Sequence, residues 1–148
     1  MAKFVPWNSQ PLEEWSKKYA IGKFIDLDGH RTHYIEKGQG KPIILLHGYF
    51  YDLLQWRKNI DALAEVFKVY AFDLWGFGYS TREPMDYSYQ LYADQLLKFM
   101  DTLNIRKASR WGSPWVAEPA YCFAPSTGSE LTRWFWWLQG GCPILRLC

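Results

Sequence analysis

The chain has 148 residues, of which 49% are apolar and 22% charged, with a formal net charge of +2. This length favours one domain with a core of its own rather than two. No apolar run approaches the roughly 18 residues of a membrane span, and the N-terminus lacks a secretory signal, so we expect a cytoplasmic protein that does not enter a membrane. The weak charge, without a basic cluster, argues against nucleic acid as a partner.

The first predicted elements are two short strands joined by a tight turn. Residues 25–27 and 32–35 alternate between apolar and polar side chains and flank Asp28-Gly29. Asp-Gly in this position predicts a β-hairpin, because the turn needs positive φ. After a loop that contains glycines, the unbroken apolar residues 43–46 predict a central strand that is covered on both faces.

An amphipathic helix and a second buried strand are predicted next. The helix is indicated by apolar residues spaced four, three and four apart, which are Trp56, Ile60, Leu63 and Phe67. Residues 68–72 form another apolar run, which predicts a strand. Residues 73–80 then form a loop punctuated by glycines.

A second helix is indicated by the spacing of Ala93, Leu96, Leu97 and Met100. Its expected N-cap is Ser88 or Asp86, and Asn104 suits a left-handed C-cap with Ile105 packing back. Strands that alternate with helices through short joints predict an α/β fold with a mainly parallel sheet. Ligands of such sheets bind at the carboxyl ends of the strands.

Two motifs at these strand ends resemble the α/β-hydrolase family, over residues 23–109. They are Leu45-Leu46-His47-Gly48 after the third strand and the pattern Asp-x-x-Gly-x-Gly-x-Ser over 73–80. Each is weak alone, but together, in this order and behind a hairpin, they are specific. The resemblance implies a partial α/β-hydrolase fold that follows an N-terminal extension over residues 1–22.

The resemblance also implies a role for the first motif. The backbone N–H groups of Tyr49 and Phe50 are the candidate oxyanion-hole donors, each able to stabilise negative charge by about 2.7–4 kcal/mol. His47 is expected to orient this loop, and Gly48 to let the backbone turn close to a substrate. No cofactor and no metal site is expected.

In the second motif, Asp73 is expected to hold its loop through backbone hydrogen bonds rather than to act as a catalytic acid. Gly76 and Gly78 are expected in tight turns, and Ser80 completes the motif. The aromatic residues near both motifs either line a pocket or pack at its rim: Tyr49, Phe50, Tyr51, Trp75 and Phe77.

The catalytic groups of such a hydrolase are missing. The family places a Gly-x-Ser-x-Gly elbow after a fifth strand, followed later by an acid and a histidine, and none of these is present. Ser113 lacks both a glycine two residues later and a following histidine. We therefore predict that no catalytic residue lies in this reading frame.

The composition also changes after Arg110. Residues 111–148 hold five of the nine tryptophans, all three cysteines and only four of the 32 charged residues. The cysteines match neither a disulfide set nor a metal-ligand spacing. We expect an irregular tail over residues 110–148.

The genetic code suggests a shifted reading frame as the origin of the tail. New codons can be read from the last base of one residue and the first two bases of the next. This frame forces glycine from Trp111-Gly112 and from Trp115-Val116, and it permits serine and methionine between them, which gives Gly-x-Ser-Met-Gly. No codon at the centre of that motif can encode aspartate.

Two further observations favour the same frame. Residues 134–137 are forced to Val-Leu-Val, the β-branched apolar run that a buried parallel strand needs. Loss of one T from Leu-Val-Gly codons also yields Arg110-Trp111-Gly112. We predict a one-base loss near Arg110.

The predicted parent is a serine hydrolase that acts on ester, lactone or carbon–carbon bonds of a small molecule, whereas this chain is truncated, inactive and poorly soluble or molten. One alternative is a non-enzymatic truncated isoform or interaction module. Others are an enzyme with an unfamiliar site and a membrane anchor formed by residues 134–138. The substrate and the oligomeric state stay open.

Overall fold

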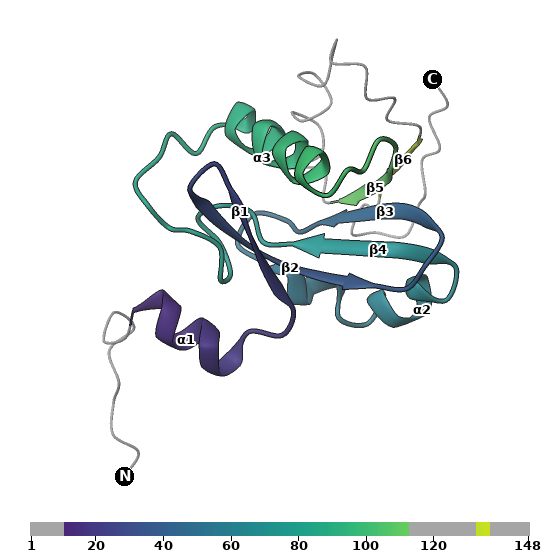
Figure 1. The fold of residues 1–148 in the computed structure, drawn as a ribbon, viewed down its shortest axis with the longest axis horizontal. Helices are drawn as coiled ribbons and strands as arrows, with labels where there is room; N and C mark the ends of the chain where they lie inside the picture. The colour runs from purple at the N-terminus through teal and green to yellow at the C-terminus, as the bar shows by residue number, and fades with distance from the viewer. Residues whose placement is uncertain (1–10, 113–132, 137–148) are drawn as a thin grey trace.

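The computed structural model describes residues 11–112 and 133–136, and these residues form one sheet with helices on both faces (Figure 1). The sheet order is β1-β2-β4-β3-β5-β6. The strands are β1 (Lys23–Leu27), β2 (His30–Lys37), β3 (Lys41–Leu46), β4 (Phe67–Phe72), β5 (Ser109–Gly112) and β6 (Arg133–Trp136). The helices are α1 (Leu12–Tyr19), the 3₁₀ helix η1 (Leu53–Trp56), α2 (Ile60–Ala64) and α3 (Tyr89–Thr102).

The predicted hairpin is confirmed, and it forms the antiparallel side of the sheet. β1 pairs with β2 through the turn at Asp28 and Gly29, whose φ angles are 56° and 86°. β2 also pairs antiparallel with β4, whereas β4, β3, β5 and β6 run parallel to one another. The sheet is therefore mixed but mainly parallel on the side where the two motifs end.

The central strands are apolar on both faces because the sheet separates two cores. Ile44 and Leu46 of β3 pack in the core beneath α3, together with Phe99. Ile43 and Leu45, the intervening residues, pack in the other core with Trp56 and Ile60. This two-sided burial confirms the prediction of a central strand covered on both faces.

The amphipathic helix predicted across residues 56–67 is wrong in its extent. The backbone instead forms η1 and then the short α2, while Phe67 begins β4, where it pairs with Lys41. Trp56 and Ile60 still face the sheet. The spacing therefore marked buried positions correctly, but the parallel pairing with β3 claims Phe67 for the strand.

The second predicted helix is confirmed as α3. The Ser88 side chain caps it by accepting a hydrogen bond from the Leu91 N–H. Asn104 adopts a left-handed φ of 54°, and the Ile105 N–H donates to the Met100 carbonyl at 2.8 Å. Ile105 is buried, as its packing back against the helix requires.

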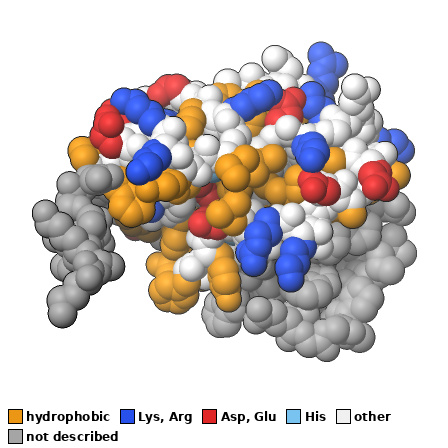
Figure 2. Space-filling view, turned by 90° about the horizontal axis from the view of Figure 1, so that it is seen from below, with side chains coloured by type: hydrophobic (Ala, Val, Ile, Leu, Met, Phe, Trp, Pro, Cys, Tyr) orange, Lys and Arg blue, Asp and Glu red, His pale blue; other side chains and the backbone are white. Residues whose placement is uncertain are grey.

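α1 was not predicted, although its charges give a signal. Glu13 and Glu14 occupy its first turn, and Lys17 and Lys18 its last turn, as the helix dipole favours. Apolar side chains gather between charged ones on the face seen from the side of α1 and α2 (Figure 2). No helix in the described ranges is both long and apolar enough to cross a membrane.

The described residues of the tail form strands, so a fifth strand is present where none was expected. β5 lies beside β3, with Gly112 opposite Leu46, and β6 lies beside β5. Ser113 and the three cysteines lie outside the described residues.

Arg110 occupies the middle of β5, a place that suits an apolar residue. It pairs with Ile44 and is only 2% exposed. Burial lowers the pKa of its guanidinium to about 9, because desolvation disfavours the charged form. A buried charge in a central strand opposes the stability of this sheet.

We predict that Arg110→Met stabilises the chain by about 1 kcal/mol or more, because the variant removes a buried charge and keeps an unbranched side chain. Arg106→Met, at an exposed position, is the matched control and should change stability by less than about 0.5 kcal/mol. Urea unfolding monitored by circular dichroism measures both. A loss of stability in Arg110→Met would contradict this view of β5.

Candidate functional site

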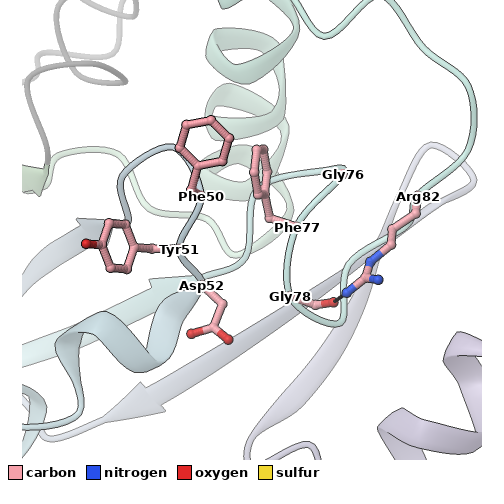
Figure 3. A pocket seen from close by; sticks show the side chains of 7 residues that line it. All are labelled: Phe50, Tyr51, Asp52, Gly76, Phe77, Gly78 and Arg82. Atoms are coloured by element: carbon pink, nitrogen blue, oxygen red, sulfur yellow. Dashed lines mark hydrogen bonds between the residues drawn. The ribbon is translucent and has the colours of Figure 1, made fainter. Parts of the chain in front are cut away.

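The two motifs meet at the carboxyl ends of β3 and β4. Their loops form a shallow, open pocket of about 470 Å³ (Figure 3), lined by Phe50, Tyr51, Asp52, Gly76, Phe77, Gly78 and Arg82. The Arg82 guanidinium donates to the Gly78 carbonyl, which holds it along the second loop. A pocket at this edge is the usual ligand position of a parallel sheet.

The Asp73 carboxylate joins the two loops. Asp73 follows β4 and is 1% exposed. Its Oδ1 accepts from the Leu53 N–H at 2.7 Å, and its Oδ2 accepts from the Tyr79 N–H at 2.9 Å. His33 Nδ1 lies 2.7 Å from the same Oδ2. These contacts occupy both carboxylate oxygens, and Asp73 is not among the residues that line the pocket.

Buried polar side chains hold the backbone around Asp73. The Ser80 hydroxyl donates to the Asp73 carbonyl at 2.7 Å and accepts from the His33 N–H at 3.0 Å. Gln95, on α3, donates to the same carbonyl at 3.1 Å and accepts from the Trp75 N–H at 3.0 Å. The second loop is therefore tied to β2 and to α3.

His47 links the two strand ends from inside the protein. Its Nε2 accepts from the Leu74 N–H at 3.0 Å, and its Nδ1 donates to the Gly48 carbonyl at 2.9 Å. Each nitrogen has one role, so the imidazole is neutral with its proton on Nδ1. Burial, the largest cause, lowers the pKa of His47.

The backbone after His47 turns outward. The Gly48 N–H donates to Gln55 Oε1 at 2.8 Å, and the Tyr51 N–H donates to the Gly48 carbonyl at 3.1 Å. Phe50 has a φ of 69°, which is uncommon for a bulky residue. Within the described part of the chain, the N–H groups of Tyr49 and Phe50 donate to no acceptor.

The aromatic residues divide between the pocket, its rim and the core. Phe50, Tyr51 and Phe77 line the pocket. Tyr49 packs edge-on against Phe77 at 5.2 Å, and it is 47% exposed. Trp75 instead lies in the core, where its indole N–H donates to Thr32 at 2.9 Å.

Sequence reasoning missed His33, Thr32 and Gln95. Thr32 and His33 are adjacent in β2 and both buried, although successive residues of a strand face opposite sides. The signal available in the sequence was the pair of adjacent polar residues, Thr32 and His33, at the start of a predicted strand. In the described residues no group of three or more His, Cys, Asp or Glu side chains could hold a metal ion.

Comparisons with known proteins agree with this architecture. Residues 41–113 match the family model described as alpha/beta hydrolase fold. A soluble epoxide hydrolase from Corynebacterium sp. strain C12 is 33% identical over 109 residues, covering 74% of this chain and 38% of that protein.

Two solved structures are similar as well. A ligand-free epoxide hydrolase superposes with a TM-score of 0.72 at 31% identity, over 78% of this chain and 41% of that one. A meta-cleavage product hydrolase superposes with a TM-score of 0.70 at 33% identity, over 77% and 44%. The chain thus spans less than half the length of these relatives.

The sheet order, the two strand-end loops and these similarities define an α/β fold of the hydrolase type. The N-terminal part of the chain belongs to the α/β-hydrolase fold family. The described strands and helices form part of that fold, which confirms the resemblance of residues 23–109.

We predict that Gly78→Ala is strongly destabilising, because a Cβ there would overlap the Asp73 carboxylate at a φ of +51°. Gly29→Ala is the matched control, since its φ is +86° and nothing lies within 4 Å of the added Cβ. The loss should be larger for Gly78→Ala by about 2 kcal/mol or more, measured by urea unfolding. Equal losses in the two variants would show that the carboxylate does not restrict this turn.

We also predict that stability falls as the pH drops below about 6.5, the ordinary pKa of histidine. The lowered pKa keeps His47 neutral in the folded protein, so the unfolded chain binds the extra proton first. His47→Gln can still accept from Leu74 without titrating. Its unfolding free energy should therefore fall less steeply between pH 6.5 and 5.5, and identical slopes in variant and parent would contradict the assignment.

Proposed function

We propose that this chain is the N-terminal part of a serine hydrolase whose coding sequence changes frame near Arg110. The observation that carries the proposal is the motif Gly-x-Ser-Met-Gly, which begins at Trp111-Gly112 in the shifted frame. That frame forces both glycines and permits the serine and the methionine. Such an elbow presents a nucleophilic serine at a sharp turn between a strand and a helix.

The register of the sheet supports this position for the elbow. Gly112 ends β5 directly opposite Leu46, the last residue of β3. A turn that follows Gly112 therefore starts beside the Gly48 loop. That loop carries the two N–H groups, of Tyr49 and Phe50, that donate to no described acceptor. A serine adduct formed there would lie within reach of these oxyanion donors.

The buried Arg110 also supports a frame change. With CGG as the Arg110 codon, an inserted T gives the leucine codon CTG, and the restored frame then places an apolar residue at this central position of β5. Residues 133–136 form β6 beside β5, and the shifted frame again encodes β-branched and apolar residues at 134–137. Both strands would then have the composition of buried parallel strands.

The encoded nucleophile favours one branch of the family. The relatives include an epoxide hydrolase and a meta-cleavage product hydrolase, and the matched N-terminal segment does not separate these chemistries. In the shifted frame the codon from Ser113-Pro114 ends in CC, so it permits serine, proline, threonine or alanine but never aspartate. We therefore infer an acyl-serine hydrolase of small esters, lactones or carbon–carbon bonds, which needs no cofactor.

This chain as written is proposed to be inactive. Its oxyanion candidates, Tyr49 and Phe50, remain, whereas residues 1–148 contain no Gly-x-Ser-x-Gly elbow and no histidine after His47. His47 is committed to the Leu74 N–H and the Gly48 carbonyl, so it cannot serve as a general base in their place.

We predict that inserting one T into the Arg110 codon converts the gene into one for an active hydrolase. The DNA from Lys98 to beyond Cys148 is sequenced first, and the repaired and original genes are then expressed and assayed with p-nitrophenyl acetate. Only the repaired product should hydrolyse the ester. Changing its new serine codon to alanine should reduce kcat by about 10⁴-fold or more.

The DNA sequence separates the alternatives. Codons that cannot encode Gly-x-Ser-x-Gly would overturn the proposal, as would an equal esterase activity of the original chain. An extra base present in the native gene would mean that the reported tail does not occur in the protein. Bases that encode the tail of this sequence, together with a shifted frame that stays open and encodes the elbow, would make the frame change genuine.

A further inference from the structure

His33 is a buried histidine that lies behind both strand-end loops. It lies in β2 and is 2% exposed. Its Nδ1 is 2.7 Å from Asp73 Oδ2, and its Nε2 is 3.1 Å from the Ile21 carbonyl oxygen. The rings of Phe24 and Tyr79 flank the imidazole, with centroids 4.9 and 5.4 Å away.

These two neighbours determine the protons on the ring. A backbone carbonyl can only accept, so Nε2 must carry a proton to bond Ile21. The Asp73 side chain already accepts from the backbone N–H groups of Leu53 and Tyr79. An ionised carboxylate, which has two acceptor oxygens and no proton, suits these two hydrogen bonds best. Nδ1 must then also donate. With both nitrogens as donors, His33 is an imidazolium paired with an aspartate.

The pair lies behind the loop that carries the oxyanion candidates. Asp73 Oδ1 accepts from the first N–H of η1, at Leu53, only three residues after Phe50. Oδ2 accepts from Tyr79 in the opposite loop. A full negative charge strengthens both hydrogen bonds relative to a neutral carboxyl group. The protons on His33 therefore bear on the placement of both loops.

We propose that His33 is held as an imidazolium and positions the loop of Tyr49 and Phe50 through the Asp73 carboxylate. His33 is thus a positioning residue and touches no reacting atom. The importance of this loop for catalysis rests on the proposed hydrolase function, but the charge state of His33 does not.

The test is nitrogen-15 NMR of the histidine rings in the full chain at pH 6. His33 should show two slowly exchanging ring N–H protons, because both are bonded inside the protein. His47 should show one, on Nδ1, and serves as the internal reference for a buried neutral ring. A single ring proton on His33, or fast exchange at Nε2, would overturn the proposal.

Two variants test the positioning. Asparagine at 33 can retain a donor near Nδ1, towards Asp73, whereas glutamine reaches only the Nε2 position. Amide exchange at Leu53 and Tyr79 should accelerate by about tenfold or more in His33→Gln and less in His33→Asn. His30→Asn, on the same strand with a more exposed side chain, should leave both rates unchanged. Unchanged rates in His33→Gln would overturn the positioning role.

These readouts involve no substrate, so they separate the two proposals. If NMR shows an imidazolium at His33 but the DNA encodes no Gly-x-Ser-x-Gly elbow, this inference stands and the serine-hydrolase proposal fails. A neutral His33 alongside an active repaired enzyme would do the reverse.

Discussion

The arrangement of both strand-end loops depends on the buried carboxylate of Asp73. Its Oδ1 accepts from the Leu53 N–H, and its Oδ2 accepts from the Tyr79 N–H and contacts His33 Nδ1. A buried charge needs such complete pairing, because an unsatisfied carboxylate would be strongly destabilising. The loops after β3 and β4 are therefore held as one unit, and the turn at Gly78 must lack a side chain.

The loop that follows β3 turns its backbone away from this carboxylate after His47. His47 binds the Leu74 N–H from inside, and Gln55 takes the Gly48 N–H. The next two N–H groups, of Tyr49 and Phe50, are left without acceptors in the described region, beside the end of β5. Fixed backbone donors without acceptors are what a preorganised anion site requires, and we predict such a site at this loop.

Local signals in the sequence predicted much of this fold. Asp28-Gly29 marked the hairpin, the two-sided apolar run marked β3, and Ser88 and Asn104 marked the ends of α3. Each depends on neighbours a few residues apart. The prediction of a helix that extends to Phe67 was wrong, because Phe67 pairs with Lys41 in the parallel sheet. No local pattern in the sequence reveals this pairing. The short strands of the tail were missed for the same reason.

The sequence by itself determined the two family motifs and the likeness to hydrolases, since these are written in adjacent residues. Only the tertiary structure decided which polar side chains surround Asp73. His33, Gln95 and Leu53 lie 40, 22 and 20 residues away along the chain. They meet because sheet register and helix packing bring them together, and burial then requires every donor and acceptor among them to be matched.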